Sequence, residues 1–112
     1  MASVPLNAFK TVTATLTSTP TNIYTTPAGV TGIVLGTQVT NITSSGSATV
    51  TAWHVRGVVS NELVNTFEIP HSDAVSIVAG KLVLESGDSL RVQASSNGAL
   101  KVTLSILESA ND

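Results

Sequence analysis

Hydrophobic and polar residues alternate with a period of two along much of the chain. In the first such run, Phe9 to Thr19, Val12, Ala14 and Leu16 fall on one side and threonines fall on the other. A period of two is typical of a half-buried β-strand, whose successive side chains point to opposite faces of the sheet. The run therefore predicts a first strand that shows threonine to solvent.

Turn residues divide the rest of the chain into short strands. Apolar patterning predicts these strands around residues 23–24, 33–42, 48–55, 63–69, 75–77, 82–84, 90–94 and 100–106. Ile33, Leu35 and Val39 share one parity whereas Ile42 has the other, so we expect a β-bulge or bend between Gly36 and Asn41. The last three strands are predicted to form a meander with tight hairpins, since the pair at 97–98 is Asn-Gly.

These elements predict an all-β chain. Gly, Pro or a Ser/Thr cluster interrupts every candidate helix of ten or more residues. About eight or nine mostly antiparallel strands with frequent turns favour a single β-sandwich or a small jelly roll, and the pattern leaves both open. We expect the sandwich over residues 9–108, an N-terminal arm or disordered terminus over 1–8, and a C-terminal tail over 109–112.

The strand parities also predict which side chains form the core. Each candidate sits at the inward parity of its strand or in a continuous apolar run. The predicted core residues are Val12, Leu16, Ile33, Leu35, Val50, Leu84, Leu90, Val92, Val102 and Leu104.

Composition narrows the classes of function. Thr, Ser and Val make up 45 of the 112 residues, only 11% of residues are charged, and the net charge is −2. A chain with so few clustered basic residues is not expected to bind nucleic acid, and it has no apolar run long enough for a membrane helix. Without cysteine, disulfides, zinc–thiolate sites and thiol nucleophiles are excluded.

The ionisable residues do not form a recognisable catalytic or metal-binding motif. His54 and His71 have no second histidine at ligand spacing, and the stretch His71-Ser72-Asp73 lies at a predicted turn. Glu85 and Asp88 flank a glycine, but two carboxylates fall short of the six to eight oxygens that Ca²⁺ takes. We therefore expect no enzyme, no catalytic residues, no metal and no cofactor.

A candidate interface is the alternative to a catalytic site. Trp53 shares a strand face with Thr51 and Val55, which gives an apolar strip suited to a protein contact or to ordinary core packing. Tyr24 is a second aromatic candidate, and Pro5 lies in the predicted arm.

Two stretches resemble small β-sandwich virion proteins of tailed bacteriophages. They are IYTTPAGVTGIVL at residues 23–35 and VAGKLVLESGDSLRV at residues 78–92, so the resemblance spans residues 23–92. It implies a structural component without catalysis, either a capsid decoration (cement) protein or a tail-associated one. Such families have no catalytic residues to transfer.

The leading hypothesis is a decoration protein that forms a homo-oligomer, a trimer or larger ring, and binds the major capsid protein in a virion assembled in the host cytoplasm. The alternatives are a tail, neck or fibre-associated protein that contacts tail proteins, and a host-receptor or carbohydrate-binding module. A polar pocket lined by Trp53, Tyr24 and the 71–73 turn would favour a binding module, and a flat apolar patch would favour the structural role.

Overall fold

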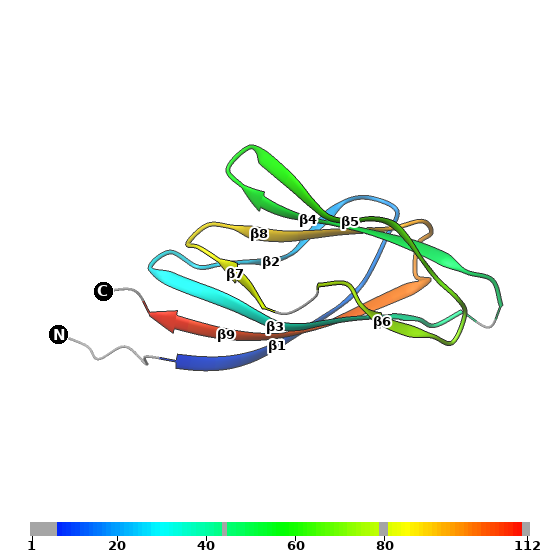
Figure 1. The fold of residues 1–112 in the computed structure, drawn as a ribbon, viewed down its shortest axis with the longest axis horizontal. Helices are drawn as coiled ribbons and strands as arrows, with labels where there is room; N and C mark the ends of the chain where they lie inside the picture. Colours follow the sequence, from blue (N-terminus) through cyan, green and yellow to red (C-terminus); the bar gives the residue numbers. More distant parts are fainter. Residues whose placement is uncertain (1–6, 44, 79–80, 111–112) are drawn as a thin grey trace.

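The computed structural model describes residues 7–43, 45–78 and 81–110, which form nine β-strands in two facing sheets (Figure 1). No helix among these residues is long and apolar enough to cross a membrane. The strands are β1 (Asn7–Thr15), β2 (Thr21–Thr25), β3 (Val30–Asn41), β4 (Ala48–Arg56), β5 (Val59–Ile69), β6 (Ala74–Ser76), β7 (Leu82–Leu84), β8 (Ser89–Ala94) and β9 (Leu100–Ala110).

The strand order is that of a jelly roll. One sheet has the order β1-β9-β3-β6, with β7 also pairing with β3, and the other has the order β2-β8-β4-β5. All of the pairings in both sheets are antiparallel. The prediction of a small antiparallel sandwich or jelly roll is therefore confirmed, and the order of the strands selects the jelly roll.

Strands that follow one another in the sequence mostly lie in opposite sheets. β7 pairs with β3, β8 pairs with β2 and β4, and β9 pairs with β1 and β3. The predicted C-terminal meander is wrong, because the turns at 85–88 and 95–99 carry the chain across the sandwich. β4 and β5 do form a hairpin, in which Arg56 lies opposite Val59.

The first strand is shorter than the predicted run. β1 ends at Thr15, after which the chain crosses to the other sheet, where the Ala94 backbone N–H donates to the Thr17 carbonyl. Its threonines beyond Thr15 belong to that crossing and not to the strand. At the chain ends, β1 begins at Asn7 and β9 extends to Ala110, each two residues outside the domain bounds expected from the sequence.

The core lies between the two sheets. Leu16, Val50, Leu84, Leu90, Val92, Val102 and Leu104 are buried as predicted, and Val12 is half-buried against them. Ile33 and Leu35 were assigned to the core wrongly: Val34 is buried, Ile33 is half-buried, and Leu35 is 37% exposed.

A β-bulge in β3 explains this error. The pairing of β3 with β9 shifts between Val34 and Gly36, so that Leu35 is the extra residue. Residues before the bulge point inward at even numbers, and residues after it, such as Thr37 and Val39, point inward at odd numbers. A bulge was expected from the change of parity, but it lies one residue before the predicted segment and inverts the faces of Ile33 and Leu35.

Candidate functional site

The most prominent surface feature is a row of apolar side chains across the β1-β9-β3-β6 sheet. Phe9 lies opposite Leu107, Leu107 lies opposite Ile33, and Ile33 lies opposite Val83, so the row runs through β1, β9, β3 and β7. Phe9 is 78% exposed and Val83 is 53% exposed. We call these four residues the apolar row.

The apolar row points away from the core because strand side chains alternate. Its neighbours Ile106, Val34 and Leu84 are buried between the sheets, which turns the residues next to them outward. The bulge residue Leu35 adds another exposed apolar side chain on β3. Cross-strand neighbours on one face lie about 4.5–5.5 Å apart at Cβ, so the row is a continuous strip.

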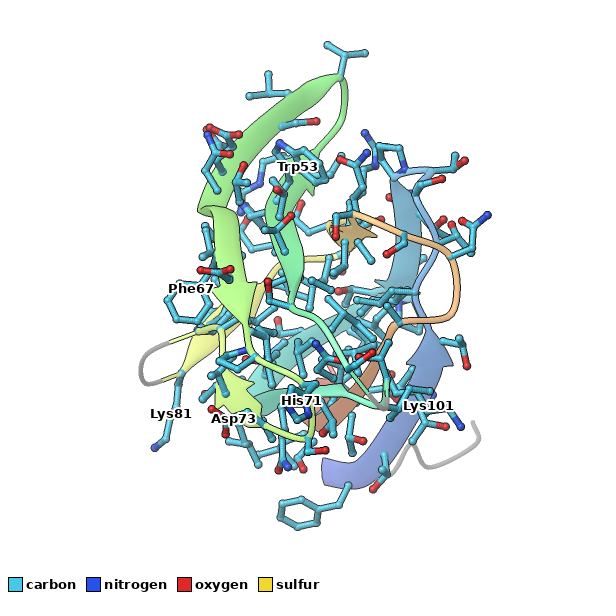
Figure 2. All side chains as sticks on the ribbon, turned by 90° about the vertical axis from the view of Figure 1, so that its right-hand side faces the viewer. Trp53, Phe67, His71, Asp73, Lys81 and Lys101 are labelled. Carbon is cyan, nitrogen blue, oxygen red and sulfur yellow. The ribbon has the colours of Figure 1, made fainter. Side chains whose placement is uncertain are left out.

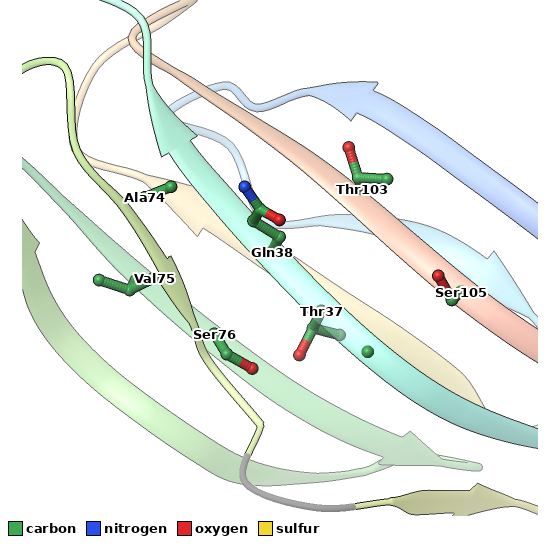
Figure 3. A pocket seen from close by; sticks show the side chains of 8 residues that line it. Thr37, Gln38, Ala74, Val75, Ser76, Thr103 and Ser105 are labelled. Carbon is green, nitrogen blue, oxygen red and sulfur yellow. The ribbon is translucent and has the colours of Figure 1, made fainter.

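The rest of this outer face is small and hydroxyl-rich. Thr11 lies opposite Ser105, and Thr13 lies opposite Thr103, which in turn lies opposite Gln38. A shallow groove of about 480 Å³ lies over β9, β3 and β6 (Figure 3). Its lining residues are Gly36, Thr37, Gln38, Ala74, Val75, Ser76, Thr103 and Ser105.

The two outer faces differ in charge. On the β1-β9-β3-β6 sheet, Lys101 is the charged side chain among the outward strand positions that the structure describes, and the exposed Lys81 directly precedes β7. Lys10 and Glu108 have the opposite parity and form an ion pair. The outer face of the β2-β8-β4-β5 sheet carries Arg91 and Glu62, which lie on either side of Trp53. Interface cores are depleted of charge, so the first face is the better candidate for a buried contact.

The structure separates the interface residues expected from the sequence. Thr51 and Trp53 are half-buried on the outer face of the β2-β8-β4-β5 sheet, and Val55 on the same face is buried. Tyr24 is buried on the inner side of that sheet, and Pro5 lies outside the described residues. Their role in an interface stays a prediction, and among the four that the structure describes, Thr51 and Trp53 are the ones with accessible surface.

Tyr24 belongs to a polar cluster between the sheets. Its hydroxyl donates to Glu108 Oε2 at 2.6 Å, and Lys10 Nζ lies 3.3 Å from the same oxygen. Burial, together with the neighbouring carboxylate, raises the pKa of Tyr24 above its ordinary value, and the hydrogen bond from Tyr24 lowers the pKa of Glu108. The cluster ties β2 to β9 and gives Tyr24 a structural role.

A second polar cluster surrounds Asp88. Arg56 donates to its carboxylate from Nε at 3.1 Å and from Nη2 at 2.8 Å, and His54 Nε2 lies 2.9 Å from Oδ2. The Glu85 backbone N–H also donates to it, at 3.0 Å. The hydrogen bonds from Arg56 hold the pKa of Asp88 well below its usual range.

This cluster explains the ionisable residues that the sequence singled out. The stretch from Glu85 to Asp88 is a tight turn, as expected. His54 lies in strand β4 and forms a hydrogen bond with Asp88. Within the described part of the chain, no three His, Asp or Glu residues are grouped as metal ligands. The predicted turn at His71-Ser72-Asp73 is also present, with the Asp73 N–H donating to the Pro70 carbonyl.

The Asp88 cluster also anchors the β4–β5 hairpin, which projects from the body of the sandwich (Figure 1). Arg56 is the last residue of β4, so its hydrogen bonds hold the base of the two-residue turn. Val58 at the tip is fully exposed. Phe67, further along β5, is 44% exposed and points away from the ribbon (Figure 2).

Comparisons with known proteins show where this fold occurs elsewhere. No family model matches the sequence, and no curated protein matches it. A pilus protein of Bacillus endospore appendages matches with a TM-score of 0.57 and 12% identity, over 100% of this chain and 98% of that one. A protein in the acid-stable capsid structure of Helicobacter pylori bacteriophage KHP30 matches with a TM-score of 0.57 and 11% identity, over 96% of this chain and 90% of that one.

At these identities the matches show a shared fold. A pentameric capsid protein from metagenomic phage sequences matches more weakly, with a TM-score of 0.40 and 20% identity over 97% of this chain and 64% of that one. The two matches with a TM-score of 0.57 show that the fold resembles that of a bacterial pilus protein and that of a protein in a phage capsid structure.

The apolar row was not predicted from the sequence. Its four members are far apart in the chain, and one of them, Ile33, had been placed in the core. The available signal was the isolated Phe9, which falls among threonines on the polar side of its strand. An aromatic residue at a solvent-facing parity is the pattern that marks such a contact.

Proposed function

We propose that this chain is a non-enzymatic structural protein of a bacteriophage virion and that it decorates the capsid. The observation that carries the proposal is the outer face of the β1-β9-β3-β6 sheet, which carries little charge and shows the exposed apolar row. Exposure of Phe9 and Val83 to water is unfavourable in a free monomer, and a contiguous exposed apolar patch marks a surface that a partner covers. The fold shared with the KHP30 capsid-structure protein supports the same role.

The geometry argues against the host-receptor or carbohydrate-binding alternative. Tyr24 faces the interior and Trp53 faces the outside of the same sheet, so the two rings cannot line one pocket. The third expected component, the 71–73 turn, is held by hydrogen bonds with Asn41 at the start of the 42–47 loop. The groove over β9, β3 and β6 has none of these expected components among its lining residues.

Labelling of intact particles distinguishes the capsid from the tail. In the phage that encodes this chain, immunogold electron microscopy is expected to place the protein over the whole capsid surface. Label confined to the tail, neck or fibres would replace decoration with a tail role. Particles that carry no label would contradict the virion role altogether.

The N-terminal arm remains part of this proposal. β1 already includes residues 7 and 8, so a deletion of residues 2–6 removes the expected arm without shortening the strand. If the arm reaches a neighbouring subunit, the shortened chain is expected to fold normally but to occupy fewer sites on the particle. Quantitative gel analysis of purified particles measures this, and unchanged occupancy would remove the arm from the proposal.

A further inference from the structure

We propose that the outer face of the β1-β9-β3-β6 sheet binds the same face of a second copy of this chain, sheet against sheet, in a two-fold dimer. This deepens the proposed function by naming the surface and its partner. The proposed dimer rests on the proposed function only for its place in a virion, because the contact between two copies can form in the purified protein alone.

The apolar row is complementary to itself. It has a large residue, Phe9, at the β1 edge and a small residue, Val83, at the β7 edge, with Leu107 and Ile33 between them. The two-fold axis of the proposed dimer lies between the two faces and runs parallel to the strands. It places the apolar row of one copy against the apolar row of the other, with the Phe9 end of each row over the Val83 end of its partner. Leu107 of each copy then faces Ile33 of the other, which has the same size, and the large Phe9 faces the small Val83 at both ends of the contact.

Charge favours a second copy as the occupant. Two identical faces repel each other little when they carry little charge, and Lys101 is the charged residue among the outward strand positions that the structure describes, while the exposed Lys81 directly precedes β7. Lys101 lies six residues from Leu107 along β9, which is about 20 Å from the apolar row and therefore at the rim. A charged partner would instead be expected at a face that carries charged side chains, such as the outer face of the other sheet with Arg91 and Glu62.

The size of the face fits a specific dimer. The nine residues of β1 and the four strand positions of the sheet give a projected area of roughly 600 Å², from about 3.4 Å per residue and about 4.8 Å per strand. A standard protein interface covers about 800 Å² per partner. Contacts near this size with a single row of apolar side chains give weak to moderate affinity, which suits a subunit that assembles in steps.

Sedimentation equilibrium of the full-length protein, from low micromolar to near-millimolar concentration, tests the contact. The wild type is expected to fit a monomer–dimer equilibrium. Phe9→Thr and Val83→Thr are each expected to weaken dimerisation by about tenfold or more, because each removes apolar contact from both copies. Phe67→Thr and Val58→Thr make the same changes at exposed positions of the other sheet and its hairpin, and are expected to leave the equilibrium unchanged.

Distances between spin labels test the geometry independently. The chain has no cysteine, so Lys101→Cys and Glu62→Cys each supply a single labelling site, at the rim of the proposed interface and on the opposite sheet. In the proposed dimer, labels at residue 101 are separated by about one sheet spacing of 10 Å plus their linkers, and labels at residue 62 by about three such spacings. Pulsed electron resonance on the dimer is expected to give the shorter distance at residue 101.

Each outcome decides the inference. A dimer that resists Phe9→Thr and Val83→Thr, or that shows the shorter distance at residue 62, overturns it, and a trimer or larger ring would require a different contact. A wild type that stays monomeric at all concentrations overturns it as well. If that monomer still binds particles and loses binding on Phe9→Thr, a capsid subunit covers the face, and the proposed function survives without the dimer.

Discussion

Replacing Leu104 with alanine is expected to lower the free energy of unfolding by about 2–5 kcal/mol, because the side chain is fully buried at the centre of β9. β9 pairs with both β1 and β3, so the neighbouring strands cannot easily move to fill the cavity. The loss combines the removed apolar contact with the cost of the remaining cavity. Urea titration followed by tryptophan fluorescence measures it, with Trp53 as the single reporter.

Leu35→Ala is the matched control for this experiment. It makes the same change at a bulge residue that is 37% exposed, and it is expected to cost less than about 1 kcal/mol. Similar losses for both variants would mean that the outer face is covered in solution and that Leu35 is not at a free surface. A small loss for Leu104→Ala would contradict the placement of the core.

Replacing Asp88 with asparagine is expected to destabilise the fold by about 1.5–3 kcal/mol at neutral pH, because the charged acceptor of Arg56 is lost inside the sandwich. Glu85→Gln is the control, since Glu85 also pairs with Arg56, at 3.4 Å, but its side chain is 70% exposed. That variant is expected to change stability by less than about 1 kcal/mol.

The effect of Asp88 depends on pH in a defined direction. Its pKa in the folded protein is lower than in the unfolded chain, so its contribution to stability is present in full above the unfolded value of about 4. The contribution is lost as the pH falls further and the carboxylate becomes protonated. The difference in unfolding free energy between wild type and Asp88→Asn is therefore expected to shrink as the pH falls below about 4. A difference that grows as the pH falls below about 4 would contradict the assignment.

The local pattern was a good guide to single strands. Alternation in Leu100 to Ile106 and in Ala48 to Ala52 predicted which side chains are buried, because the side-chain period of a strand is fixed by its backbone. Turn chemistry at 70–73 and 85–88 was equally readable, since it depends on only a few adjacent residues.

The same pattern was unreliable wherever the register changed. A bulge adds one residue and inverts every face beyond it, and its exact position depends on the partner strand. The parity change in β3 was visible in the sequence, but only the pairing with β9 places it at Leu35. The assignment of Ile33 to the core failed for this reason.

By itself, the sequence determined that this chain is a small all-β domain with short antiparallel strands and little charge, because these properties follow from composition and from local periodicity. The tertiary structure decided which strands pair, and so replaced the expected C-terminal meander with strands that cross between two sheets. It also brought together Phe9, Ile33, Val83 and Leu107, and joined Asp88 to Arg56 and His54. Contacts between such distant residues depend on the order of strands in the sheets, which is set by packing of the whole chain and leaves no local pattern in the sequence.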